Sequence, residues 1–240
     1  YRKASKMARW DKMAKTFSKI GKDIALAVKA GGSDPEANPA LRRCILNAKG
    51  ANMPKDNVER AIKKASGADA ENYEEINYEG YGQGGVAFFV ECTTNNTTRT
   101  VANVRAIFNK FDGNLGKNGE LAFIFDRKGI FTIDLAQIKM DWDDFEMEMI
   151  DGGAEDVEKD EDEVLITTAF EDFGSLSHKL DELKIEAKSA ELQRIPNNSK
   201  EVSLEQFKIN MKMLERFEDD DDVQNVYHNM EMTDELLETL

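Results

Sequence analysis

The side chains with the clearest chemical role in this sequence are the lysines and arginines of residues 1–67. That segment holds 16 Lys and Arg against six Asp and Glu, a net charge of +10, whereas residues 68–240 carry −25. Ammonium and guanidinium groups bind phosphate oxygens and release the counterions condensed on a nucleic acid. The charge asymmetry therefore predicts that one end of the chain binds a polyanion while the acidic remainder is kept off it.

Four of these lysines recur at the spacing of an α-helix. Lys12, Lys15, Lys19 and Lys22 lie roughly opposite an apolar face in a helix expected over residues 4–29. That apolar face comprises Met13, Phe17, Ile20, Ile24, Ala27 and Val28. A solvated face of an amphipathic helix is the alternative interpretation, but acids are nearly absent here and the next two helices add cations. The predicted nucleic-acid contacts are Arg2, Lys3, Lys6, Arg9, Lys12, Lys15, Lys19, Lys22, Arg42, Arg43, Lys55, Arg60, Lys63, Lys64, Arg99 and Arg105.

A polar stretch over residues 95–99 lies between a predicted strand and a predicted helix. Its side chains suit the N-cap of that helix. The alternative is that the helix N-terminus binds a phosphate or RNA together with Arg99 and Arg105. Tyr78 and Tyr81 also allow two interpretations, because alternating tyrosines either stack on bases or pack within a sheet, and the strand pattern favours packing.

Motifs for catalysis, metal binding and cofactor binding are missing from the sequence. No residues assemble a nucleophile, a base and an orienting group, so we expect no catalytic residues and no enzymatic activity. The GxGxxG pattern of residues 80–85 precedes a strand instead of opening a helix, which indicates a hairpin turn and not a dinucleotide site. His178 and His228 lack partner ligands, and the acidic runs lack EF-hand spacing. We therefore expect no metal, no cofactor and no small-molecule substrate.

Cysteine usage and hydropathy bear on the location of the protein. Cys44 and Cys92 form no CxxC pair, and we expect both to be reduced, buried thiols in a cytosolic setting. No apolar run approaches the ~18 residues of a membrane span, and no signal-peptide h-region follows the basic N-terminus. A cytoplasmic protein without a membrane partner is expected, and a compartment reached through a cleaved presequence is the alternative.

Three amphipathic helices account for the basic segment. The first ends at Gly31-Gly32, and the second begins near Asn38-Pro39, with Asn38 as the N-cap, and stops at Gly50. Pro54 opens the third helix, whose apolar residues point inward and whose cations point outward. A polar linker follows over residues 68–75, so we place a basic helical domain at residues 1–75.

Two α/β domains are expected after the linker. The first begins in ββαβ order and is left unfinished, with strands at 76–81, 86–93 and 121–125 and a helix at 97–111. A complete βαββαβ unit follows, with strands at 130–134, 154–158, 164–168 and 187–195 and helices at 142–150 and 173–183. A helix at 204–217 and a strand at 223–230 can complete the first unit.

The predicted fold class is therefore α+β multidomain. It has an N-terminal three-helix domain and two α/β domains, one of which is ferredoxin-like (βαββαβ) and inserted into the other. We place the ferredoxin-like domain at residues 129–199 and the discontinuous domain at residues 76–128 and 200–240.

Several long motifs make the chain similar to a known family. They are Arg2-Lys3-Ala4, Lys15-Thr16-Phe17-Ser18-Lys19, Gly31-Gly32-Ser33-Asp34-Pro35-Glu36-Ala37-Asn38-Pro39-Ala40-Leu41-Arg42, Ala51-Asn52-Met53-Pro54-Lys55-Asp56-Asn57-Val58-Glu59-Arg60-Ala61-Ile62-Lys63-Lys64, Tyr78-Glu79-Gly80-Tyr81-Gly82 and Arg99-Thr100-Val101 through Arg105. On these residues the chain resembles the YebC/PmpR family, also called the mitochondrial translational activator of cytochrome oxidase family, over nearly its whole length. Two stretches depart from the family pattern. The family's Thr-Asp-Asn-Arg-Asn-Arg reads Thr94-Asn95-Asn96-Thr97-Thr98-Arg99 here, and Gln83 replaces the Pro of a Gly-Pro-Gly turn.

The resemblance implies a three-domain, cytosolic, non-enzymatic regulator of gene expression. Some members are described as DNA-binding transcriptional regulators, and others as ribosome-associated translation factors that assist the synthesis of difficult nascent peptides. The first hypothesis is a nucleic-acid-binding transcriptional regulator whose partner is promoter DNA. Ribosomal RNA, with the ribosome as a further partner in translation regulation, is the alternative, because both targets present phosphates. A second alternative is a protein–protein adaptor whose acidic domains bind a basic partner.

Overall fold

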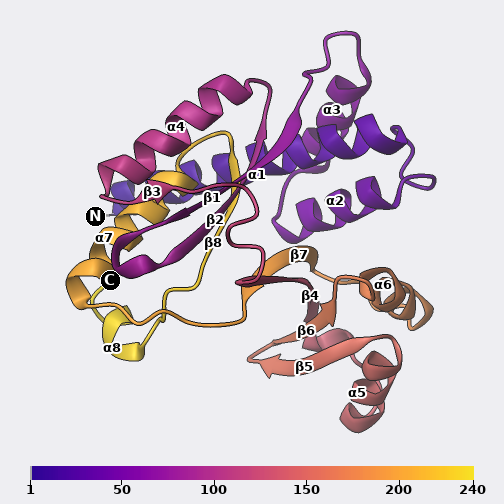
Figure 1. The fold of residues 1–240 in the computed structure, drawn as a ribbon. Coiled ribbons are helices and arrows are strands. Elements are labelled where there is room, and N and C mark those ends of the chain that lie inside the picture. The colour runs from indigo at the N-terminus through magenta and orange to yellow at the C-terminus, as the bar shows by residue number, and fades with distance from the viewer. Residues whose placement is uncertain (1) are drawn as a thin grey trace. The chain divides into compact units, whose positions relative to one another are not determined.

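The chain divides into two compact units. The computed structural model describes the backbone of residues 2–240 and the side chains of residues 13–240. The first unit comprises the chain up to residue 70 together with residues 127–194, and the second comprises residues 71–126 and 195–240. The chain therefore leaves the second unit and later returns to it, which the colours of Figure 1 make visible.

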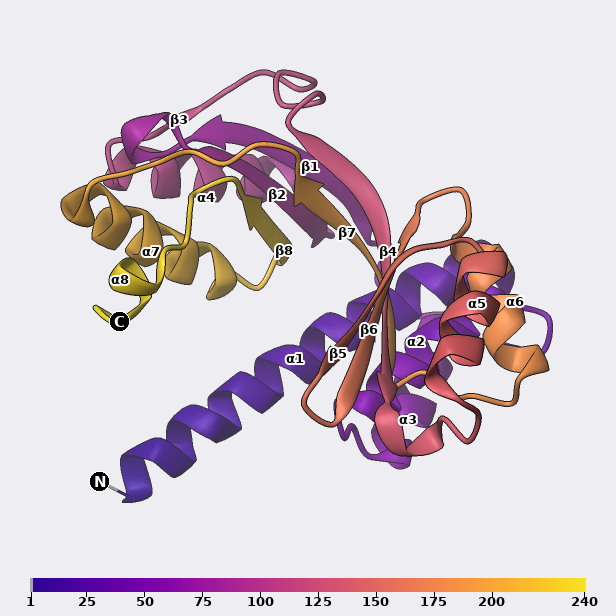
Figure 2. The same cartoon turned by 90° about the horizontal axis from the view of Figure 1, so that it is seen from below.

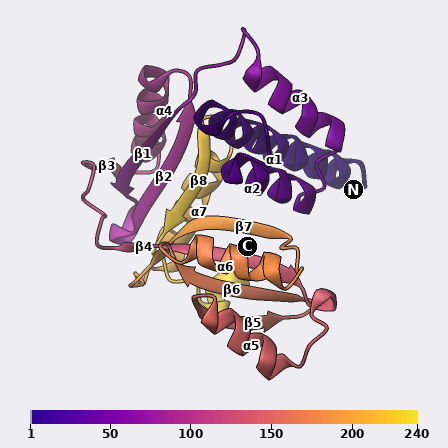
Figure 3. The ribbon, with the colours of Figure 1, turned by 90° about the vertical axis from the view of Figure 1, so that its right-hand side faces the viewer.

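The first unit begins with three helices around a small apolar core. They are α1 (Arg2–Gly31), α2 (Pro39–Gly50) and α3 (Lys55–Ser66), and α1 contacts both of the others (Figure 3). The core includes Ile24, Leu41, Ala48 and Val58. Asn38 caps α2, as predicted, because its side-chain oxygen accepts a hydrogen bond from the Leu41 N–H at 3.1 Å. Its amide nitrogen donates to the carbonyls of Ala27 and Gly32, both at 2.8 Å, so Asn38 ties α2 to the end of α1.

The rest of the first unit is a ferredoxin-like sheet with two helices. Its elements are β4 (Phe125–Asp134), the short helix η2 (Leu135–Gln137), α5 (Trp142–Asp151), β5 (Ala154–Asp160), β6 (Glu163–Ala169), α6 (Phe173–Glu182) and β7 (Ser189–Pro196). The strand order β5-β6-β4-β7 is that of a split βαβ arrangement, and β6 pairs antiparallel with both neighbours. α5 and α6 lie on the same side of the sheet (Figure 2), where Phe131, Phe145, Ile166 and Leu176 form the core. The predicted ferredoxin-like domain is confirmed.

The second unit is assembled from two stretches of chain. The first contributes β1 (Glu74–Tyr81), η1 (Gln83–Gly85), β2 (Ala87–Thr94), α4 (Thr97–Lys110) and β3 (Asn114–Leu115), and the second contributes α7 (Leu204–Glu218), β8 (Val223–His228) and α8 (Asp234–Leu237). The strands lie in the order β3-β1-β2-β8, so β8 joins the sheet formed by the first stretch. Phe88, Phe108, Phe207 and Phe217 pack between this sheet and the helices α4 and α7. The predicted insertion of one α/β domain into the other is therefore confirmed.

One predicted strand is wrong. Residues 121–124 form turns, β3 lies earlier, and Phe125 already belongs to β4. The apolar run instead packs a loop onto the sheet, because Leu121 and Phe125 are buried in a cluster with Ala87 and Phe89. The buried carboxylate of Glu79 fixes this loop by accepting hydrogen bonds from the Gly119 and Leu121 N–H groups at 2.8 and 2.6 Å.

No helix among the described residues has the length and apolar character needed to cross a membrane.

Candidate nucleic-acid interface

The cations predicted on α1 fall into two groups. The side chains of Arg2, Lys3, Lys6, Arg9 and Lys12 lie outside the described residues. Of the others, Lys15 and Lys19 are half-buried, and Lys22 is buried with only 9% of its surface exposed. The second half of the stripe is therefore not the open, solvated face that the helical spacing predicts, and Lys22 is less suitable as a phosphate contact.

The two arginines of α2 both contact other parts of the first unit. The Arg42 Nη1 donates to the carbonyls of Pro35 and Glu36 at 3.1 and 3.2 Å, although Arg42 stays exposed. The Arg43 guanidinium lies 5.4 Å from the ring centroid of Phe173 on α6, within the range of a cation–π contact. Arg43 therefore links α2 to the ferredoxin-like domain, and sequence spacing alone did not predict this role.

Helix α2 is hydrogen-bonded to the backbone of the edge strand β7. The Asn47 amide donates to the Ala190 carbonyl at 3.0 Å and accepts from the Ala190 N–H at 2.8 Å, as a neighbouring strand would. Gly50 permits this approach, because a Cβ at that position would lie 1.9 Å from the Lys188 carbonyl oxygen. Leu46 of α2 adds an apolar contact with the ferredoxin-like core. The contacts of Leu46, Asn47 and Gly50 thus form an interface between the helical and ferredoxin-like domains, and we call this interface the seam.

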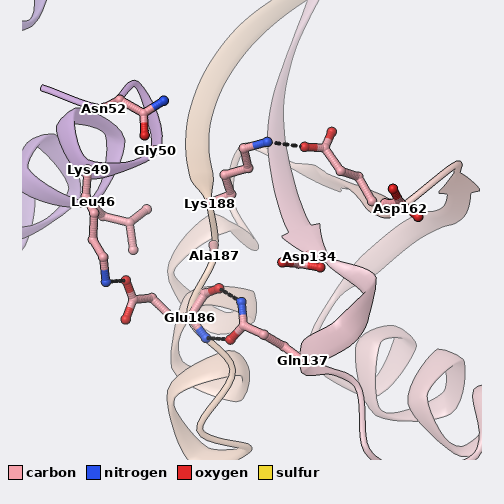
Figure 4. Close-up of a pocket in the computed structure, with 11 residues that line it drawn as sticks. Leu46, Lys49, Gly50, Asn52, Asp134, Gln137, Asp162, Glu186, Ala187 and Lys188 are labelled. Carbon is pink, nitrogen blue, oxygen red and sulfur yellow. Dashed lines mark hydrogen bonds and ion pairs between the residues drawn. The ribbon is translucent and has the colours of Figure 1, made fainter.

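An open pocket lies along this seam (Figure 4). Both lysines that line it are paired with carboxylates: Lys49 with Glu186 at 2.5 Å, and Lys188 with Glu163. The Gln137 amide closes one wall through two hydrogen bonds with the Glu186 backbone, at 2.7 and 3.0 Å. Because both lysines are paired with carboxylates, and Asp134 and Asp162 add further negative charge to the lining, we interpret the pocket as part of the seam and not as a phosphate site.

α3 presents its cations outward. Val58 is buried in the helical core, whereas Lys55, Arg60, Lys63 and Lys64 are exposed. The Lys55 side chain is 87% exposed, and its ammonium is 3.6 Å from Glu59, a distance typical of a loose surface pair. Arg60 is oriented along the helix by a hydrogen bond from its Nε to the Asp56 carbonyl at 3.2 Å. Among the described side chains, α3 is therefore the most accessible group of predicted phosphate contacts.

Arg99 forms an ion pair with Asp222 inside the second unit. Its guanidinium donates to the Asp222 carboxylate, from Nη2 at 2.8 Å and from Nε at 3.1 Å, and the hydrogen bond and the charge of Asp222 raise the pKa of Arg99. The Thr100 hydroxyl donates to the same carboxylate at 2.9 Å, and the Asp222 side chain is only 7% exposed. Asn96 is the N-cap of α4 through a bond from the Arg99 N–H at 3.0 Å. The N-cap interpretation is confirmed, and Arg99 joins the two stretches of the discontinuous unit. Arg105, the other predicted contact on α4, is exposed.

The glycine-rich turn before β2 is locked by a residue that the sequence did not single out. Asn210 of α7 is fully buried, and its side chain accepts from the Gln83 N–H and donates to the Gln83 carbonyl, each at 2.9 Å. Gly84 has a φ of 72°, which suits a tight turn and excludes most other residues. The hairpin-turn interpretation of residues 80–85 is therefore confirmed.

Tyr78 is buried, as the packing interpretation predicts, and burial raises the pKa of its hydroxyl.

Burial shifts the pKa of one histidine, His228, and of one cysteine, Cys44. Burial lowers the pKa of His228, whose Nδ1 accepts from the Met230 N–H at 3.2 Å. Burial raises the pKa of the Cys44 thiol to about 12, which keeps it protonated and a poor nucleophile. Within the part of the chain that the structure describes, no three His, Cys, Asp or Glu side chains form a group that could hold a metal.

Comparisons with known proteins match nearly the whole chain. Residues 1–68 match the model of the TACO1/YebC protein N-terminal domain, and residues 73–230 match that of the TACO1/YebC second and third domain. A Bacteroides fragilis protein named "Probable transcriptional regulatory protein" is 54% identical over 98% of this chain and 96% of its own. A Porphyromonas gingivalis protein of the same name is 51% identical over 96% and 95%. The crystal structure of a conserved hypothetical protein from Aquifex aeolicus has a TM-score of 0.80 at 38% identity, covering 93% of this chain and 92% of the other.

Proposed function

This chain belongs to the TACO1/YebC family, and we propose that it is a non-enzymatic regulator of transcription that binds DNA through its helical domain. The observation that carries the proposal is the exposed cationic surface of α3, formed by Lys55, Arg60, Lys63 and Lys64. It belongs to a segment of net charge +10 in a chain of net charge −15. The name of the curated relatives, which refers to transcriptional regulation, supports DNA as the ligand.

The chemistry of α3 indicates how the contact works. Lysine ammonium groups and the guanidinium of Arg60 bind phosphate oxygens, which position a protein on a duplex without reading its sequence. Each phosphate neutralised contributes about 0.9 to the slope of log affinity against log salt for B-DNA. The acidic remainder of the chain repels a long duplex, so binding is limited to the basic domain.

The test compares two triple variants of equal charge change in the full chain. The first is Lys55→Gln, Arg60→Gln and Lys63→Gln on α3. The matched control is Lys139→Gln, Lys208→Gln and Lys212→Gln, three exposed lysines outside the helical domain. Binding is measured by fluorescence anisotropy with a labelled DNA duplex over a range of salt concentrations, and a structured RNA of similar length is measured in parallel.

We expect the α3 variant to lose DNA affinity and about 2–3 units of salt slope, because three phosphate contacts disappear. The control variant should keep the parent slope. Equal binding by both variants would show that α3 does not contact the duplex. Tighter binding of the RNA than of the DNA by the parent would replace DNA with RNA as the ligand.

A further inference from the structure

Two large apolar side chains on α5 face solvent. Met147 is 61% exposed and Ile150 is 60% exposed, whereas Phe145 and Met149 of the same helix are fully buried in the ferredoxin-like core. Met147 and Ile150 are three residues apart, so they are neighbours on one face of the helix. That face lies opposite the one that packs on the sheet, and folding of the domain leaves it uncovered.

The surroundings of this apolar pair are strongly acidic. Residues 141–163 contain thirteen Asp and Glu and one lysine. Glu148, Glu155 and Glu163 are paired with Lys179, Lys128 and Lys188, so the remaining ten carboxylates carry the local excess of negative charge. Asp143, Asp144 and Asp151 are exposed, and helical spacing places them beside Met147 on the outer face of α5. The one lysine, Lys159, lies 3.8 Å from the ring centroid of Trp142 and is held there by a cation–π contact.

We propose that this face of α5 is a docking surface for a lysine- and arginine-rich protein segment that carries an apolar side chain. We call it the acidic face and define it as Met147, Ile150, Asp143, Asp144 and Asp151. Charge complementarity selects the partner, because the carboxylates attract ammonium and guanidinium groups and repel nucleic acids and anionic membranes. The exposed Met147 and Ile150 supply the apolar contact that a purely electrostatic attraction lacks, and methionine adapts its shape to different partners.

This surface goes beyond DNA binding by the helical domain. The cations of α3 and the carboxylates of the acidic face have opposite charge and therefore select opposite classes of partner. The surface would let the protein hold a basic protein independently of a nucleic acid. Its test does not depend on DNA binding, because the probe is a peptide and all substitutions lie outside the helical domain.

The probes are two labelled peptides of equal length and charge. One alternates lysine with leucine, and the other has serine in place of each leucine. Their binding to the full chain is measured by fluorescence anisotropy at several salt concentrations. The apolar variant is Met147→Asp with Ile150→Asp, and its matched control is Leu237→Asp with Leu240→Asp, two apolar residues that are 42% and 73% exposed. The charge variant is Asp143→Asn, Asp144→Asn and Asp151→Asn, with Glu201→Gln, Glu205→Gln and Glu215→Gln as its control.

The parent should bind the leucine peptide about tenfold more tightly than the serine peptide. Met147→Asp with Ile150→Asp should remove that preference even though it adds two negative charges, and the Leu237 and Leu240 control should keep it. The charge variant should weaken both peptides and reduce the salt dependence, whereas its control should not.

Three results would overturn the proposal. One is equal binding of the two peptides by the parent. Another is an unchanged preference in the Met147 and Ile150 variant, whose fold is checked by circular dichroism. The third is self-association of the parent, seen by analytical ultracentrifugation and abolished by the same variant, which would assign the surface to a second copy of this chain.

Discussion

Replacing Asp222 with alanine should destabilise the second unit by about 2–3 kcal/mol. The carboxylate is almost fully buried and accepts hydrogen bonds from the Arg99 guanidinium and from the Thr100 hydroxyl. Breaking a buried ion pair costs about 3–5 kcal/mol when the remaining charge stays buried. The Arg99 side chain is 47% exposed, so water can solvate it. The Thr100 hydroxyl can redirect its single hydrogen from the missing carboxylate to the Asn96 carbonyl oxygen, which lies 2.9 Å away. These two compensations reduce the expected loss of stability to about 2–3 kcal/mol. That is within the range of the contribution of hydrogen bonds to charged groups.

Hydrogen exchange resolves this effect within the second unit. A loss of about 2 kcal/mol corresponds to about a thirtyfold loss of amide protection in the core of that unit, on α4 and β8. Tryptophan fluorescence is unsuitable for this purpose, because Trp10 and Trp142 both belong to the first unit. The matched control is Glu59→Ala, which removes the carboxylate of an exposed pair with Lys55 and should cost less than about 0.5 kcal/mol.

If Asp222→Ala lowered the free energy of unfolding as little as Glu59→Ala does, that result would refute the reasoning. Burial is what distinguishes the Arg99–Asp222 pair from the Lys55–Glu59 pair. The complementary variant Arg99→Ala should destabilise the unit more than Asp222→Ala, because it leaves a buried carboxylate without its cation. It should leave DNA affinity unchanged at temperatures where the protein is folded. A selective loss of DNA affinity would instead support the phosphate contact predicted from the sequence.

Two further predictions concern the seam and the pH dependence of stability. Gly50→Ala should lower the free energy of unfolding by about 2 kcal/mol in urea titrations, because its Cβ would overlap the Lys188 carbonyl, whereas Gly174→Ala, which meets nothing within 4 Å, should not. Burial lowers the pKa of His228 in the folded state, so protonation favours the unfolded chain, and stability should fall as pH drops below about 6.5. His228→Phe should reduce that fall.

Elements defined by local patterns could be predicted from the sequence. α4 begins at Thr97, as predicted, its cap Asn96 lies in the polar stretch where the N-cap was expected, and the helix ends at Lys110, one residue before the predicted end. The ferredoxin-like order was predictable because each strand and helix carries its own apolar periodicity. The same reasoning failed at residues 121–125, where apolar spacing belongs to a loop that Glu79 fixes from 42 residues away.

Side-chain roles that depend on distant partners could not be predicted. Arg99 meets Asp222 across 123 residues, and Asn47 pairs with Ala190 across 143 residues. A cation on a predicted helix looks the same whether it binds phosphate, as proposed for Lys63, or an aromatic ring, as Arg43 does. Composition therefore indicated a basic segment, and only the three-dimensional contacts distinguished its exposed cations from those used for packing.

The seam connects the two proposed binding surfaces, the cations of α3 and the acidic face of α5, within one compact unit. α3 and α5 belong to the same compact unit, and the contacts of Asn47 and Gly50 join the helical domain to the ferredoxin-like domain that carries α5. A phosphate backbone attracted to α3 would be repelled by the carboxylates around Met147, whereas a basic segment would be repelled by α3 and attracted to α5. Opposite charges on one support therefore keep the two ligands from competing.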